Sequence, residues 1–129
     1  MTSLPLLALV VAAYAALALV APSWLETVLF SLSLLSGATL WFRGDDLLLV
    51  ISLVLLGIEI SRATSSSSAA ILNHVLSLVV FIVALIGFIV MPQLGNTTFF
   101  LILLMTLIDV IAGFTVTITA ARRNVSYDE

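Results

Sequence analysis

The stretch that decides the fold class is residues 97–121, TTFFLILLMTLIDVIAGFTVTITAA, in which Asp109 is the only charged residue. A helix needs about 20 predominantly apolar residues to cross the ~30 Å hydrocarbon core of a bilayer. The stretch is long enough, and Asn96, directly before it, is of a residue type that caps the first turn of a helix. We therefore predict a transmembrane helix here, ending before Arg122.

The rest of the chain has the same character. Hydrophobic residues make up 63% of it and charged residues 9%, with a mean hydropathy of +1.35, whereas an average soluble domain has about 25% charged residues. Four further apolar stretches cover residues 4–21, 24–42, 47–62 and 69–91. We predict an all-α, single-domain, polytopic transmembrane helix bundle with five spans, a polar tail over 122–129 and a negligible extramembrane part. Four spans is the alternative, because 47–62 is short enough to lie along the interface.

Two tryptophans mark the expected second span. Trp24 and Trp41 are 17 residues apart, about 26 Å along a helix, which is close to the separation of the two interfacial belts that tryptophan prefers. Ser23 and Glu26 have the spacing of a capping box. These features predict a helical crossing over 24–42.

Arginines set the expected orientation. Five crossings place Arg62, Arg122 and Arg123 on one side of the membrane and Arg43 on the other. Cytoplasmic loops carry the excess of positive charge. The sequence therefore predicts an integral protein of the cell (inner) membrane, with its C-terminus cytoplasmic and its N-terminus outside.

Composition excludes several classes of function. The chain has no lysine and a net charge of −3, so it offers no basic surface to nucleic acid. It has no cysteine and a single histidine, which excludes thiolate chemistry and metal sites built on several imidazoles. No catalytic motif is present. We expect no enzyme, no cofactor and no metal.

Asp109 is the sharpest functional candidate. It is the thirteenth residue of its 25-residue stretch, near the expected bilayer midplane. A central Asp costs about 2.5–3.5 kcal/mol on insertion scales, so it should face protein or water. Thr106 and Gly113 lie on the same helical face as Asp109. Two interpretations stay open: a hydrogen-bonded group that joins helices, or a relay for protons or cations.

A second candidate group lies near the expected cytoplasmic surface. Glu59 and Arg62 are three residues apart near the end of one span, and His74 lies near the start of the next. Their active interpretation is a gate or a quinone-headgroup site. The alternative is an interfacial ion pair beside a capped histidine.

Small residues at four-residue spacing favour close helix packing. They occur as Ala8, Ala12 and Ala16 in the first span, as Ser33 and Gly37 in the second, and as Gly113 in the fifth. These faces suggest an associating subunit, accessory or homo-oligomeric, of a membrane complex, whose partners are the lipid bilayer and either itself or another membrane subunit. The alternative function is an oligomeric small channel or transporter with Asp109 midway along its path.

Overall fold

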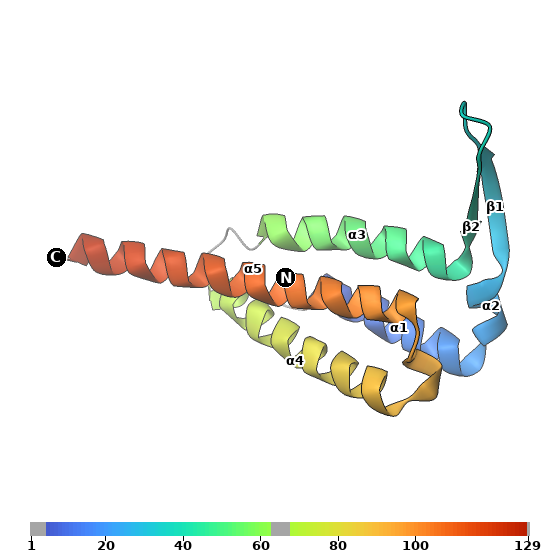
Figure 1. Ribbon diagram of the computed structural model, residues 1–129. Coiled ribbons are helices and arrows are strands. Elements are labelled where there is room, and N and C mark those ends of the chain that lie inside the picture. The colour runs from blue at the N-terminus through green and yellow to red at the C-terminus, as the bar shows by residue number, and fades with distance from the viewer. Residues whose placement is uncertain (1–4, 63–67, 129) are drawn as a thin grey trace.

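The protein is mostly helical, with 78% of its residues in helices, and belongs to the all-α class. The computed structural model describes residues 5–62 and 68–128, and describes side chains over 5–61 and 71–115. Four long helices form an antiparallel bundle, and a β-hairpin projects from one end of it (Figure 1). The elements are α1 (Leu6–Val20), α2 (Pro22–Glu26), β1 (Val28–Ser33), β2 (Thr39–Arg43), α3 (Gly44–Arg62), α4 (Ser68–Val90), a 3₁₀ turn (Pro92–Leu94) and α5 (Thr97–Asp128).

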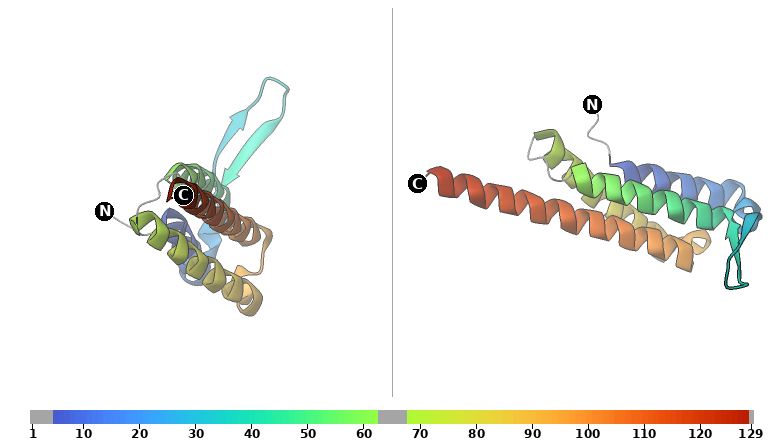
Figure 2. Two further views of the ribbon diagram at one scale, coloured as in Figure 1. Left: turned by 90° about the vertical axis from the view of Figure 1, so that its left-hand side faces the viewer. Right: turned by 90° about the horizontal axis from the view of Figure 1, so that it is seen from above.

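The helices alternate in direction along the bundle. α1 and α4 run toward the end that carries the hairpin, which we call the hairpin end, and α3 and α5 run back (Figures 1 and 2). The start of α1 and the end of α5 therefore lie toward the same end, which we call the terminal end. An odd number of crossings would place them at opposite ends. The structure does not confirm a five-span bundle.

The predicted helix over 24–42 is wrong. This segment forms the short helix α2 and then the antiparallel hairpin of β1 and β2, paired as Phe30 with Phe42, Ser31 with Trp41, Leu32 with Leu40 and Ser33 with Thr39. The capping box is absent as well, because α2 begins at Pro22 and its N-cap, Ala21, has no side-chain hydrogen bond. The two tryptophans therefore do not mark the ends of one helix.

Local sequence explains the hairpin. Apolar and polar residues alternate over Phe30–Ser31–Leu32–Ser33, which is the period of a strand and not of a helix. At the tip, the Gly37 N–H donates to the Leu34 carbonyl at 3.0 Å, and Gly37 has a φ of +91°. Glycine adopts this backbone conformation without steric cost. Strand alternation and a glycine turn therefore outweigh the overall hydrophobicity that suggested a span.

Two helices are long and apolar enough to cross a membrane, over Ile71–Val90 and Thr97–Thr115, which favours membrane association. α1 is apolar but shorter, 15 residues, or about 22 Å at 1.5 Å per residue. α3 has 19 residues and carries acidic side chains at both ends, Asp45 and Asp46 in its first turn and Glu59 in its last.

The apolar core fills the half of the bundle next to the hairpin. Phe99 and Ile102 of α5 are fully buried there, and the ring of Tyr14 from α1 packs against Phe99 with their centroids 5.4 Å apart. Leu94, in the turn between α4 and α5, closes this core from the hairpin end. The other half of the bundle contains the polar side chains described next.

Candidate functional site: a buried polar layer

Buried polar side chains from three helices meet in the terminal half of the bundle. α3 contributes Glu59, α4 contributes Asn73, His74 and Ser77, and α5 contributes Thr106 and Asp109; each is exposed over 4% of its surface or less. We call these six residues the polar layer. α5 packs against both α3 and α4, so its inner face completes a layer that the other two helices begin.

Glu59 ties three segments of the chain together. Its carboxylate accepts a hydrogen bond from the Asn73 side-chain amide, with Nδ2 and Oε2 3.0 Å apart, and another from the backbone N–H of Leu6. Leu6 is the first residue of α1. A carboxylate at a helix N-terminus satisfies an otherwise unpaired N–H group and is favoured by the positive end of the helix dipole. Glu59 therefore fixes the start of α1 against α3 and α4.

Ser77 links α4 to Asp109. The Ser77 Oγ lies 3.0 Å from Asp109 Oδ2 and also 3.0 Å from the backbone carbonyl oxygen of Asn73. A serine hydroxyl has one hydrogen to donate. A protonated Asp109 allows both contacts to be full hydrogen bonds, because the carboxyl then donates to Ser77 while Ser77 donates to the carbonyl. With Asp109 ionised, the Ser77 hydroxyl can donate to only one of the two oxygens at a time.

His74 fills the space beside Gly113. A Cβ atom at Gly113 would lie 2.6 Å from His74 Nδ1 and 2.8 Å from His74 Cγ, so only glycine leaves room for the ring. The carboxylate of Glu59 interacts electrostatically with the same ring. Two buried atoms, Nε2 of His74 and Oδ1 of Asn73, have no hydrogen-bond partner among the described residues. A buried polar atom without a protein partner is uncommon, and a bound water, an ion or a functional role are the explanations for it.

The structure brings together most of the residues singled out from the sequence. Asp109, Glu59 and His74, which the sequence assigned to two separate groups, belong to one layer. Thr106 lies in it too, but its hydroxyl donates to the carbonyl of Leu103 in its own helix at 2.6 Å. Arg62 ends α3, and its side chain is outside the described residues.

The small residues that the sequence suggested for helix packing lie in three different environments. Gly113 lies inside the bundle against His74, whereas Ala12 and Ala16 face outward from α1 and Ala8 is half-buried. Ser33 and Gly37 lie in the hairpin, at the end of β1 and in the turn. The helical Ser33–Gly37 spacing therefore has no meaning in this fold.

Asn73 and Ser77 are functional candidates that the sequence reasoning did not select. They are four residues apart on the helix α4, so they share one face, and His74 is next to the first of them. Polar residues at this spacing within an otherwise apolar span were the available signal. Its partner helices could not be identified, because Glu59 is 14 residues from Asn73 and Asp109 is 32 residues from Ser77.

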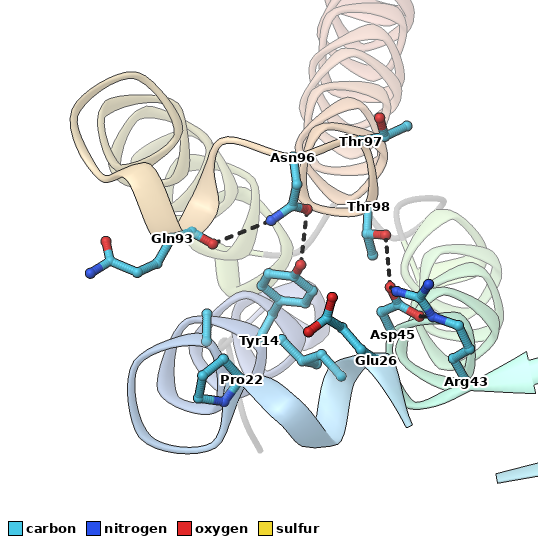
Figure 3. Close-up of a pocket in the computed structure, with 11 residues that line it drawn as sticks. Tyr14, Pro22, Glu26, Arg43, Asp45, Gln93, Asn96, Thr97 and Thr98 are labelled. Atoms are coloured by element: carbon cyan, nitrogen blue, oxygen red, sulfur yellow. Dashed lines mark hydrogen bonds and ion pairs between the residues drawn. The ribbon is translucent and has the colours of Figure 1, made fainter. Parts of the chain in front are cut away.

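A second polar region lies at the hairpin end of the bundle, around a cavity of about 340 Å³ (Figure 3). Tyr14 donates a hydrogen bond to Asn96 Oδ1 at 2.9 Å on one side of it. On the other side, Thr98 contacts Asp45, with Oγ1 and Oδ2 3.4 Å apart. The carboxylate of Glu26 points into the space between these pairs (Figure 3). The apolar core around Phe99 and Ile102 separates this cavity from the polar layer.

The charged residues beside the cavity also form the start of α3. Arg43 forms an ion pair with Asp45 through two of its nitrogens, Nη2 at 2.7 Å and Nε at 3.2 Å. The hydrogen bonds that Arg43 donates to the Asp45 carboxylate, together with the negative charge of Asp45, raise the pKa of Arg43 above its ordinary value. The Asp46 carboxylate accepts from the backbone N–H of Arg43 at 3.1 Å, which caps α3. These contacts serve the helix start, so we place the principal functional candidates in the polar layer.

The polar layer does not resemble a metal site or a nucleophile–base pair. Within the described residues, no group of three or more His, Cys, Asp or Glu side chains is arranged to hold a metal ion. The Ser77 hydroxyl contacts Asp109 and the Asn73 carbonyl, and no bond between Ser77 and His74 is among the described contacts. Three side chains of the layer, Glu59, His74 and Asp109, are of types that can bind a proton, and the others are hydrogen-bond donors or acceptors. Comparisons of the chain with protein-family models, curated proteins and solved structures return no match.

Proposed function

We propose that this chain crosses a bilayer four times, through α1, α3, α4 and α5, and exchanges protons through the polar layer. The observation that carries the proposal is the burial of three ionisable side chains in one layer of one chain: Glu59, His74 and Asp109 are 1%, 4% and 3% exposed. Ionisable groups inside a membrane are costly, and in membrane proteins they commonly mark proton relays and transport paths. A single chain supplies the whole group, so the site does not require a second copy.

Ser77 supports a proton-dependent change at Asp109. With Asp109 protonated, the carboxyl donates to Ser77 and Ser77 donates to the Asn73 carbonyl. When the proton leaves, Ser77 turns its one hydrogen toward the Asp109 carboxylate and gives up its hydrogen bond to the Asn73 carbonyl. His74 can bind a proton at Nε2 without breaking a described hydrogen bond. The layer thus offers two neighbouring proton positions, one on α5 and one on α4.

Proton flux into vesicles tests this function. We expect the full chain, reconstituted in phosphatidylcholine vesicles with a trapped pH dye and a clamped potential, to dissipate a pH gradient faster than protein-free vesicles. D109N should reduce the flux to the protein-free level, because the amide keeps a hydrogen bond to Ser77 but cannot titrate. T115V is the matched control, since Thr115 lies on the same helix and is exposed. Flux that is absent in the wild type, or unchanged in D109N, would overturn the proposal.

Orientation follows from the arginines. Arg62, at the end of α3, and Arg122 and Arg123, late in α5, belong to the terminal end, whereas Arg43 lies at the hairpin end beside acidic residues. The positive-inside rule then places both chain ends in the cytoplasm and the hairpin outside. This replaces the expectation of an external N-terminus, which depended on an odd number of crossings.

Association into a membrane complex is a second candidate function, and the outward alanine face of α1 favours it. Ala12 and Ala16 are exposed one turn apart, so a second helix could approach α1 closely there. In that case A12F together with A16F should convert an oligomer to a monomer in mild detergent, while V83F, on the outward surface of α4, should not. A wild-type chain that is monomeric in both detergent and bilayers would exclude self-association.

A further inference from the structure

The hairpin leaves a surface that the bundle does not cover. Every residue of β1 is exposed, and at the tip and in β2 Leu35 and Trp41 are among the most exposed hydrophobic residues. No charged residue occurs between Glu26 and Arg43. A two-stranded hairpin is at best marginally stable alone in water and needs a further surface to pack against.

The two faces of the hairpin differ in chemistry. Directly paired residues of antiparallel strands lie on the same face. One face, the apolar face, therefore carries Phe30, Phe42, Leu32 and Leu40, with the two phenylalanine rings stacked 4.8 Å apart. The opposite face, the polar face, carries Ser31, Ser33, Thr39 and Trp41.

The hairpin also points in a distinctive direction. Viewed along the bundle, it extends sideways from the helices and not along them (Figure 2, left). If α4 and α5 cross a bilayer, a sideways extension at the helix ends lies along the membrane surface. The next helix, α3, has its own outward apolar residues from Val50 and Ile51 onward, so the bundle beyond the hairpin also presents apolar side chains where it would face lipid.

We propose that the hairpin is a lipid-docking element, which lies in the interfacial layer of the outer leaflet with its apolar face on the acyl chains and its polar face toward headgroups and water. This inference rests on the proposed crossing of the bilayer by the helices. The interfacial layer suits both chemical features: it contains water and headgroups that can pair with the open strand edges, which hydrocarbon could not, and it is the region where tryptophan such as Trp41 is enriched.

Depth measurements on single spin labels test the inference. The chain has no cysteine, so one introduced cysteine gives one label. In the full chain in phosphatidylcholine vesicles, labels on L32C and L40C should be relaxed strongly by oxygen, which concentrates in hydrocarbon, and weakly by a water-soluble nickel chelate. Labels on S31C and T39C, on the other face, should show the reverse. Each label on the apolar face has a control on the same strand, S31C for L32C and T39C for L40C. A difference in accessibility within such a pair therefore reports which face of the hairpin meets lipid.

A label on V83C separates the two proposals. Val83 is exposed in the middle of α4 and should be deep in lipid if the helices cross the bilayer. A deep V83C label with water-accessible labels at both L32C and S31C would overturn the lipid-docking element and leave the crossing intact. A water-accessible V83C label would overturn the crossing itself.

The competing occupant of the hairpin is a second copy of the chain, paired along a strand edge. It would produce spin–spin broadening at L32C or T39C that disappears when labelled chains are diluted with unlabelled ones, and that result would also overturn lipid docking. The expected result is unbroadened spectra at all four hairpin positions.

Discussion

The two halves of the bundle are held together by different forces. Near the hairpin, the helices are joined by close packing of apolar and aromatic side chains, among them Phe99, Ile102 and Tyr14. Near the terminal end, Glu59 and Asp109 accept hydrogen bonds from other helices. In a membrane, lipid tails solvate apolar side chains about as well as another helix does. Apolar contacts between helices therefore stabilise the bundle mainly through close packing, whereas hydrogen bonds determine which helix faces meet. We infer that the polar half sets which helix faces meet and that the apolar half supplies close packing.

Removal of the largest buried ring should have the largest effect on stability. F99A should lower the free energy of unfolding by about 2 kcal/mol, below the roughly 3–5 kcal/mol known for buried Phe in water-soluble proteins, because in separated membrane helices the ring would already be in lipid. F100A is the control, since Phe100 is 41% exposed. Reversible unfolding in mixed detergent micelles measures both. Equal losses for the two variants would show that fit does not hold this half together.

The polar half can be disturbed at one glycine. G113A places a methyl group against the His74 ring, 2.6 Å from Nδ1, and should cost about 1.5 kcal/mol, which is within the range known for overpacking of a tight interior. G57A is the matched control on α3, because nothing lies within 4 Å of its added Cβ. That variant should be neutral or up to about 1 kcal/mol more stable, from helix propensity alone. The same unfolding assay applies, and a G113A variant as stable as G57A would mean that the ring moves aside freely.

Some helix starts could be predicted from local signals, but two other local predictions were wrong. The helix α5 continues to Asp128, past the end predicted before Arg122, and the capping box at Ser23 and Glu26 does not begin a helix. The start of α5 follows from Asn96, whose Oδ1 accepts from the N–H of Phe99 at 2.9 Å, and Pro92 and Gly95 mark the turn before it. The hairpin was missed because average hydropathy does not distinguish a span from an exposed strand. The alternation over residues 30–33 is the discriminating signal, and a 17-residue spacing of two tryptophans does not by itself indicate a helix.

Four of the six residues of the polar layer could be selected from the sequence, namely Glu59, His74, Thr106 and Asp109, but their pairing could not. Asp109 was recognisable as a carboxylate in an apolar span, and His74 as the only histidine. Which of them meet depends on how each helix is rotated about its own axis, and packing over the whole bundle determines that rotation. The bond from Leu6 to Glu59 joins residues 53 apart, and no local pattern predicts it.

The smallest expected effect on stability is at Asn96, at the hairpin end. Variants there also test whether polar contacts at this end affect proton flux, as those in the polar layer should. N96A removes the N-cap of α5 and the acceptor for Tyr14 together, and should cost about 1 kcal/mol, as loss of a cap does. N96D replaces the amide oxygen by a carboxylate oxygen at the same position, which both donors can use, and should restore the stability. Q93A is the control, because Gln93 is exposed and contributes only its backbone carbonyl to Asn96. Proton flux should be unchanged in all three variants, since the apolar core separates this site from Asp109. A flux defect in N96A with its fold intact would mean that the two polar regions are coupled through that core.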